Sequence, residues 1–186
     1  MIRKIFFPHV TAAVLVTGVL LLVYASVQQQ YRTSANDPQV QIARDAAIKL
    51  KQGKTIAEIV KPDTVDIEQS LGSCIQLYGP AGNLSASTGY IGTQPPTMPA
   101  GVLNKAKQDG EYDVTWQPSA MARMAAVVIY TGGRQGSYVV VARQLEEVEK
   151  REAALVKMVF LCWLLCMCII SAHGLLQAYL NRKTTI

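Results

Sequence analysis

The side chains that most often carry catalysis or bind metals lie almost entirely in two apolar stretches of this 186-residue chain. The only histidines are His9 and His173, one in each stretch, and Cys74 is the only cysteine between the stretches. A Ser-His-Asp triad, a Cys-His pair or a histidine-rich metal site therefore cannot be assembled in the middle of the chain. Ser-Lys chemistry stays formally possible, but no spacing favours it. We expect no enzymatic activity, no cofactor and no metal site.

The remaining cysteines and His173 lie in the second apolar stretch. Cys162 and Cys166 share one helical face, but a metal site needs further ligands and polar surroundings, so we favour a role in packing. His173 has three possible roles: a polar contact between membrane helices, a proton-responsive group, or a side chain that snorkels to the interface. The sequence leaves these three open. Cys74 stands alone, which excludes a disulfide within the central region.

Two charge-free runs dominate the pattern of the chain. Residues 5–31 carry no formal charge over 27 positions, and residues 158–181 carry none over 24. At about 1.5 Å per residue each run can cross a hydrocarbon core of roughly 30 Å as a helix. We therefore predict a transmembrane helix over 5–31 and a second one over 158–180.

Basic residues flank both runs at the ends nearest the chain termini, and they predict the orientation in the membrane. Arg3 and Lys4 precede the first run, and Arg182 and Lys183 follow the second. Positive flanks stay cytoplasmic, so we expect residues 1–4 and 181–186 in the cytoplasm and the central region outside the membrane. Cleavage of a signal peptide after Ala25 is the alternative for the first run. The length of the apolar stretch favours a retained anchor.

The net charge of +5 comes from residues next to the two runs, which are Arg3, Lys4, Lys157, Arg182 and Lys183. Residues 28–155 contain 13 basic and 13 acidic residues, so the central region is neutral overall. Binding of nucleic acid needs a basic surface, and the sequence offers none there. We therefore predict no nucleic-acid partner.

Helical and strand-like patterns alternate through the central region. Apolar residues at helical spacing predict a helix over 38–52, capped by Asn36 and followed by a short helical turn that Pro62 ends. A hairpin of strands at 73–78 and 84–88 follows, and then a helix over 100–109. Three antiparallel strands at 112–116, 121–130 and 137–142 complete the region, with a turn over 132–136. The predicted fold class is α/β (α+β), with one antiparallel sheet of about five strands.

A long helix leads from the last strand toward the second apolar run. Leu145, Val148, Leu155 and Val159 repeat with heptad spacing, interrupted by Glu152, and neither Gly nor Pro occurs between Arg143 and His173. This seam over 145–159 fits a parallel homodimer, and it fits packing against the first membrane helix equally well. The predicted segments are thus the central domain at 32–143 and a juxtamembrane helix at 144–157.

Three stretches of the chain resemble the extracytoplasmic sensor half of bacterial membrane histidine kinases of the single-Cache or PAS-like kind. They are the strand and turn IQLYGPAG at 75–82, the helix start PAGVL at 99–103, and VVARQLEEVEKR at 140–151. The resemblance covers roughly residues 28–160. It implies a two-pass protein of the bacterial inner membrane whose outer domain senses a signal.

We expect no kinase part beside the sensor-like region. Residues 181–186 follow the predicted second transmembrane helix, so we expect any signal to leave through a partner membrane protein, either a kinase or a transporter. The alternative is a structural subunit that helps to assemble an envelope complex. A small-molecule ligand is possible under the first reading.

The resemblance also directs attention to a ligand pocket between the sheet and the helices that cover it. The residues expected to line such a pocket are Tyr78, Trp116, Arg123 and Tyr130. Arg123 is a charge within an apolar strand, where an unpaired guanidinium is costly. A carboxylate ligand, Asp113 or Glu111 on the neighbouring strand, or solvent can satisfy it, and we favour a structural role. The aromatic residues are more typical of a core than of a ligand contact.

Overall fold

The computed structural model describes residues 2–34, 37–60, 63–132 and 136–183. The chain divides into two compact units. The helix pair comprises Met1–Tyr31 and Lys150–Ile186, and the sheet unit comprises Arg32–Glu149. The predicted turn over 132–136, the cap at Asn36, the stop at Pro62 and the end of the tail at 184–186 lie wholly or partly outside the described residues.

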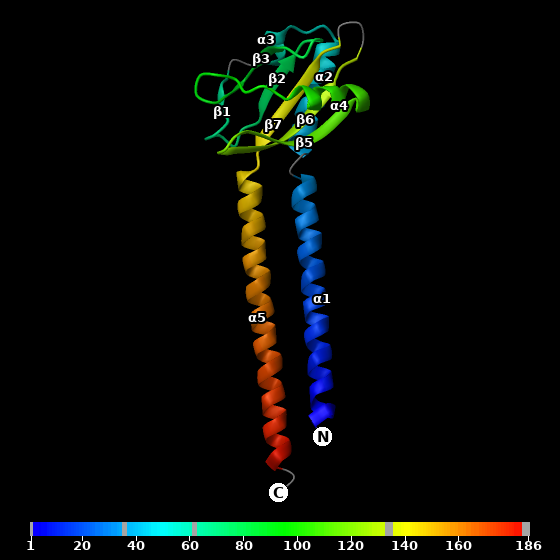
Figure 1. Ribbon diagram of the computed structural model, residues 1–186, viewed down its shortest axis with the longest axis vertical. Helices are drawn as coiled ribbons and strands as arrows, with labels where there is room; N and C mark the ends of the chain where they lie inside the picture. Colours follow the sequence, from blue (N-terminus) through cyan, green and yellow to red (C-terminus); the bar gives the residue numbers. More distant parts are fainter. Residues whose placement is uncertain (1, 35–36, 61–62, 133–135, 184–186) are drawn as a thin grey trace. The chain divides into compact units, whose positions relative to one another are not determined.

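The sheet unit contains a five-stranded antiparallel sheet in the order β3-β2-β7-β6-β5 (Figure 1). Its strands are β2 (Cys74–Tyr78), β3 (Leu84–Ser87), β5 (Glu111–Ser119), β6 (Ala122–Tyr130) and β7 (Tyr138–Gln144). The predicted α+β class and the antiparallel sheet of five strands are confirmed. The last strand, β7, lies at the centre between β2 and β6.

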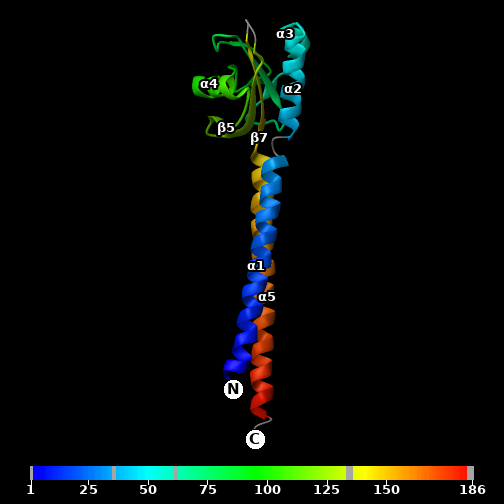
Figure 2. The ribbon, with the colours of Figure 1, turned by 90° about the vertical axis from the view of Figure 1, so that its right-hand side faces the viewer.

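Helices cover both faces of this sheet (Figure 2). Helix α2 (Asp37–Lys51) packs through Ala43, Ala46 and Ala47 on Val127, Val139 and Val141, and the short helix α3 (Ile56–Ile59) joins it through Ile59. Helix α4 (Ala100–Asp109) packs through Leu103 and Ala106 on the opposite face, against Ala126, Val128 and Val140. Burial on both faces explains why β6 and β7 read as almost continuous apolar runs.

One part of the sheet unit has no counterpart in the sequence-based prediction. Strands β1 (Val65–Asp66) and β4 (Gly89–Tyr90) form a separate two-stranded parallel sheet. Gly89 lies in close contact with β2, because a Cβ atom at this position would stand 2.7 Å from the Cβ of Cys74 and 2.8 Å from Cδ1 of Ile67. Strands of two residues are too short to show a period, so no pattern marked them.

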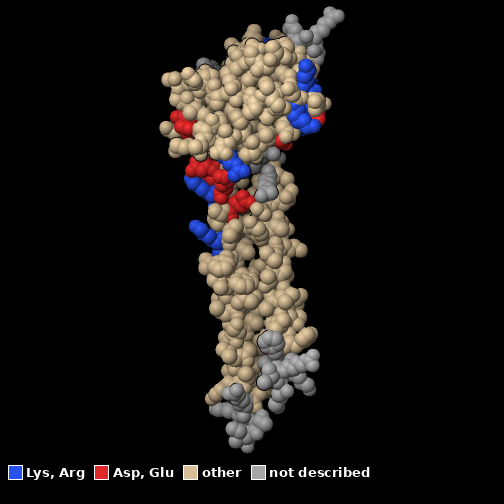
Figure 3. Space-filling view, viewed as in Figure 1, with Lys and Arg blue, Asp and Glu red and all other residues tan. Residues whose placement is uncertain are grey.

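The helix pair consists of α1 (Ile2–Ser34) and α5 (Glu146–Lys183), which run next to each other in Figure 1 and overlap in the turned view of Figure 2. Both are long and apolar enough to cross a membrane, over Phe7–Tyr31 in α1 and within Glu146–Asn181 in α5. Most charged residues of α5 lie between Glu146 and Lys157, and the middle of the helix pair is uncharged in the view of Figure 3. Helix α5 begins at Glu146, so its first turn belongs to the sheet unit.

Candidate functional site

Tyr78, the first of the predicted ligand contacts, is a hydrogen-bonded core residue. Its side chain is 1% exposed; its hydroxyl donates to Oε1 of Gln76 (2.9 Å) and accepts from the backbone N–H of Met98 (2.7 Å). Gln76 is also buried and donates to the carbonyl of Pro96 at 2.6 Å. This network ties the loop before α4 to the sheet. Burial raises the pKa of Tyr78 to about 12, so the hydroxyl stays protonated at neutral pH.

Tyrosines from three neighbouring strands form a row across one face of the sheet. Tyr78 of β2 stands opposite Tyr138 of β7, which in turn stands opposite Tyr130 of β6. The rings of Tyr130 and Tyr138 lie 5.0 Å apart, and Nζ of Lys107 in α4 lies 5.9 Å from the Tyr130 ring. Tyr130 is half-buried, so this row runs from the core toward solvent. The strand register alone brings Tyr138 between the two predicted residues, and the sequence does not show that register.

Trp116 lies on the same face of the sheet but far from this row. It is 6% exposed and stands opposite Met124 of β6. Tyr130 lies six positions after Met124 on β6, which corresponds to roughly 20 Å along an extended strand. Trp116 therefore packs in the core at the other end of β6 and does not share a pocket with Tyr130.

Arg123 lies on the opposite face of the sheet from the three aromatic residues. It alternates with Met124 on β6, and Met124 belongs to the core beneath α4. Its side chain is 57% exposed, and its guanidinium contacts the carboxylate of Glu149 at 2.8 Å. Its carboxylate partner is Glu149, whereas the sequence suggested Asp113, Glu111, a ligand or solvent. Arg123 lies near the beginning of β6, where solvent reaches the side chain, so the expected burial cost is absent.

The carboxylates considered as partners of Arg123 have other neighbours. Glu111 accepts two hydrogen bonds from Arg44 of α2, at 3.0 and 3.1 Å. These bonds raise the pKa of the Arg44 guanidinium. Burial, and then the nearby charge of Glu111, raise the pKa of Asp113. The Arg44–Glu111 pair thus links α2 to the edge strand β5.

Arg123 is bonded to the junction between β7 and α5 through both its backbone and its side chain. A single residue, Leu145, separates the last residue of the strand from the first of the helix. The N–H of Leu145 donates to the carbonyl of Arg123 (2.8 Å), and the N–H of Glu149 donates to the carbonyl of Leu145 (2.9 Å). Together with the Arg123–Glu149 ion pair, these bonds fix the first turn of α5 to β6.

Polar contacts between described residues join the two helices of the pair at three places. Nε2 of Gln28 donates to Glu152 at 2.5 Å, and Nε1 of Trp163 donates to the hydroxyl of Thr17 at 3.0 Å. The third contact joins His9 and His173, whose ring nitrogens lie 3.2 Å apart. The contacts occur at three levels of the pair, so they fix how the helices face each other.

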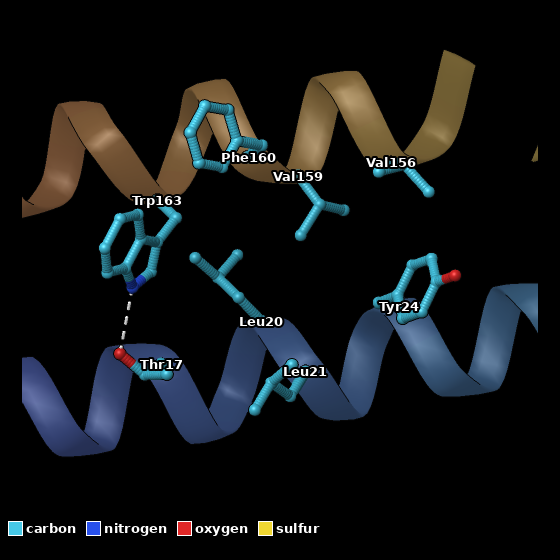
Figure 4. Close-up of a pocket in the computed structure, with 8 residues that line it drawn as sticks. All are labelled: Thr17, Leu20, Leu21, Tyr24, Val156, Val159, Phe160 and Trp163. Atoms are coloured by element: carbon cyan, nitrogen blue, oxygen red, sulfur yellow. Dashed lines mark hydrogen bonds between the residues drawn. The ribbon is translucent and has the colours of Figure 1, made fainter. Parts of the chain in front are cut away.

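An apolar groove of about 370 Å³ runs between the helices (Figure 4). Helix α1 contributes Thr17, Leu20, Leu21 and Tyr24, and helix α5 contributes Val156, Val159, Phe160 and Trp163. The Thr17–Trp163 hydrogen bond closes one end. The rings of Phe160 and Trp163 lie stacked with centroids 6.2 Å apart.

The C-terminal half of the seam predicted over 145–159 faces α1. Leu155 is 9% exposed, Glu152 binds Gln28, and Val159 lines the groove. Packing against the first helix therefore accounts for these positions within one chain. Dimerisation through the seam stays a prediction.

Nothing in the described residues points to a metal centre. The described residues contain no group of three or more His, Cys, Asp or Glu side chains that could hold an ion. No protein-family model and no curated protein matches the chain.

Proposed function

We propose that this protein is a membrane-anchored sensor subunit whose outer domain modulates a partner membrane protein, a kinase or a transporter, through its membrane helices. The observation that carries the proposal is the β7–α5 junction. One residue separates the central strand from the membrane helix, and Arg123 holds the first turn of that helix by an ion pair and a backbone hydrogen bond. A rearrangement of the sheet unit would therefore act directly on α5.

The strand order supports the resemblance to PAS-like and single-Cache sensor domains. The hairpin β2–β3 forms one edge, and the last strand, β7, returns to the centre beside the first strand of the hairpin. PAS-like domains share this arrangement, with helices packed against the sheet and the last strand leading out of the domain. The length of α5 and its uninterrupted helix fit the role of an output helix.

The topology of the proposal is a two-pass protein of the bacterial inner membrane with both termini in the cytoplasm and the sheet unit outside. The basic flanks of the two apolar runs support this orientation. An impermeant thiol reagent tests it in intact cells with single cysteines at Gln108, an exposed position of α4, and at Thr185. We expect labelling at position 108 only. Labelling at position 185 would contradict the orientation.

The sensing step is open to a direct test on the full chain in lipid nanodiscs. Small molecules of the envelope, carboxylates among them, are screened for a rise in the melting temperature of the sheet unit. A ligand can shift α5 only if it binds two conformations of the protein, which differ in the position of α5, with different affinities. Disulfide crosslinking between chains with a cysteine at Val148, on a background without the native cysteines, then reports whether the ligand moves the helix.

Arg123→Ala and Arg44→Ala form a matched pair for this experiment. Both remove an exposed arginine that pairs with a glutamate, but Arg44 lies on α2, far along the chain from the junction. We expect Arg123→Ala to abolish the change in crosslinking and Arg44→Ala to leave it intact. If no ligand raises the melting temperature and crosslinking is constant across growth conditions, the sensor role is wrong.

An assembly subunit of an envelope complex is the second candidate. Two of the aromatic residues considered as ligand contacts, Tyr78 and Trp116, are core residues, which favours a domain that packs for its own stability. This candidate predicts that Arg123→Ala changes stability alone. It also predicts that the full chain is recovered in a stable complex with another membrane protein in every growth condition.

A further inference from the structure

The only two histidines of the chain meet between the membrane helices. His9 of α1 and His173 of α5 are 164 positions apart in sequence, yet Nε2 of His9 lies 3.2 Å from Nδ1 of His173. Their ring centroids are 5.3 Å apart, and the rings are tilted by 33°. The other nitrogen of His173 lies 3.5 Å from Nε2 of Gln177, one turn further along α5.

Gly174 leaves room for this contact. A Cβ atom at Gly174 would stand 3.2 Å from Cδ2 of His9 and 3.4 Å from its Nε2. Only a residue without a side chain lets the His9 ring lie this close to α5 without displacement. The contact is thus built by three positions on two helices.

The separation of 3.2 Å fits a hydrogen bond in which one imidazole donates and the other accepts. A neutral imidazole has one N–H and one lone pair, so the pair holds one proton between the two facing nitrogens. When both facing nitrogens carry a proton, both are donors and neither can accept. The same contact then changes from attractive to repulsive.

No other ionisable side chain occurs within one turn of either histidine, over 5–13 and 169–177. The next ones along the two helices are Lys4, Arg3 and Tyr24 on α1, and Cys168, Tyr179 and Arg182 on α5. No carboxylate is among them. A doubly protonated pair would therefore have no neighbouring acidic residue in these segments to neutralise it.

Protons can reach the pair from one aqueous side. His9 lies five residues from Lys4, which corresponds to about 8 Å along a helix, and both histidines fall within the candidate membrane spans. Histidine is the side chain that ordinarily changes its charge between about pH 5 and 8. An ionisable residue within a membrane segment is costly and usually functional.

We propose that His9 and His173 form a proton-operated latch between α1 and α5. With one proton between the facing nitrogens, the N–H···N bond joins this end of the helices. Uptake of protons from the adjacent aqueous phase until both rings are imidazolium makes both facing nitrogens donors, so the bond is lost and the rings separate. The proposal depends on residues of the helix pair alone, so it is independent of whether the sheet unit senses a ligand.

Solid-state NMR on the full chain in lipid bilayers tests the latch, because histidine labelled with ¹⁵N and ¹³C reports on these two rings only. EDTA is present to exclude a bridging metal ion. At about pH 8 we expect a cross-peak between the two rings, with one facing nitrogen protonated and the other not. At about pH 5 we expect both rings to be imidazolium and the cross-peak to be lost.

Substitutions of His9 separate the latch from simple packing. His9→Gln keeps a hydrogen-bonding side chain that does not titrate, and His9→Phe keeps an apolar ring. We expect the distance between spin labels on the two helices near this end to increase at acid pH in the native chain and to stay constant in both variants. A cross-peak that persists with both rings protonated, or no cross-peak at either pH, would overturn the proposal. A distance change that survives in His9→Gln would overturn it as well.

Discussion

Different forces stabilise the sheet unit and the helix pair, each within itself. In the sheet unit, apolar side chains on both faces of β6 and β7 are withdrawn from solvent, and the buried polar groups Gln76 and Tyr78 bind one another. In the helix pair, Leu155 is the only buried side chain among the described residues, and three polar contacts join the helices. Burial from water stabilises the first unit, whereas in a membrane lipid would cover most of the second and leave the orientation of its helices to a few contacts.

The largest effect is expected where the sheet unit is packed most closely. Gly89→Ala would place a Cβ atom 2.7 Å from the Cβ of Cys74 and 3.0 Å from its sulfur, and both are buried. We expect the free energy of unfolding to fall by about 3 kcal/mol or more. Urea denaturation of the full chain in nanodiscs, followed by strand circular dichroism, measures the loss.

Gly101→Ala is the matched control for this substitution. Gly101 lies in α4, and a Cβ atom there would meet no atom within 4 Å. Replacing a helical glycine by alanine stabilises by roughly 0.5–1 kcal/mol. Equal effects of the two substitutions would contradict the close approach of β4 to β2.

Alkaline pH should destabilise the sheet unit specifically. Burial raises the pKa of the Cys74 thiol to about 11 and that of Tyr78 to about 12. In the unfolded chain both groups lose their protons at lower pH than in the folded chain. The folded state therefore holds more protons in this range, and stability falls as pH rises from about 9 toward 11.

The loss assigned to Cys74 is about 2–3 kcal/mol once the pH exceeds 11. Cys74→Ala removes that contribution, so the slope of stability against pH between about 9 and 11 should become smaller. A slope unchanged in this variant would show that the thiol is not protected. At pH 8 we also expect the folded native chain to resist alkylation at Cys74, and denaturant to expose the thiol.

Tyr78→Phe tests the polar network inside the sheet unit. It removes the hydroxyl that bridges Gln76 and the N–H of Met98, and so leaves a buried donor and a buried acceptor unpaired. The expected cost at neutral pH is about 1–3 kcal/mol. Tyr112→Phe on β5, where the side chain is only partly buried, is the control with the same chemical change. Similar losses in the two variants would contradict a specific role of the Tyr78 hydroxyl.

The same contrast explains which features the sequence predicts. The apolar run over 121–130 predicts a central strand because a strand covered on both faces contains few polar residues, and β6 confirms it. The hairpin, α2 and α4 follow from turn chemistry and helical spacing. Helix α5 begins at Glu146, two residues after the predicted start at 144, because β7 continues to Gln144.

Contacts that depend on register or on helix rotation do not follow from the sequence. Tyr138 stands between Tyr78 and Tyr130 only because of the strand register. Glu149 reaches Arg123 because one residue turns the chain from strand to helix. A helix that is apolar on all sides gives no preferred face, so the meeting of His9 and His173 requires the structure.

Within the helix pair, a single polar contact should have a smaller effect. Thr17→Val removes the acceptor of the Trp163 hydrogen bond and keeps the shape of the side chain. Hydrogen bonds between membrane helices contribute on average about 0.6 kcal/mol. We expect the free energy of helix–helix association to fall by about that amount. SDS titration in mixed micelles measures it, with Trp163 fluorescence as the signal in a chain that carries Trp116→Phe.

Thr11→Val controls for the loss of a hydroxyl from α1. The Thr11 hydroxyl donates to the carbonyl of Phe7 in its own helix, as that of Thr17 does to Ala13. Its removal should leave the helix–helix free energy unchanged. If Thr11→Val costs as much as Thr17→Val, the contact between helices adds nothing and the groove is held by apolar packing alone.

The smallest effect on stability is expected at the junction on which the proposed function depends. Both partners of the Arg123–Glu149 pair are about half exposed, so solvent screens their attraction. A double-mutant cycle with Arg123→Ala and Glu149→Ala should give a coupling of less than about 0.5 kcal/mol that decreases further at high salt. The Arg44–Glu111 pair, with two hydrogen bonds, should show the larger coupling of the two. If Arg123→Ala instead unfolds the sheet unit, any signalling defect of this variant has a structural cause; a small coupling lets a defect be assigned to the position of α5.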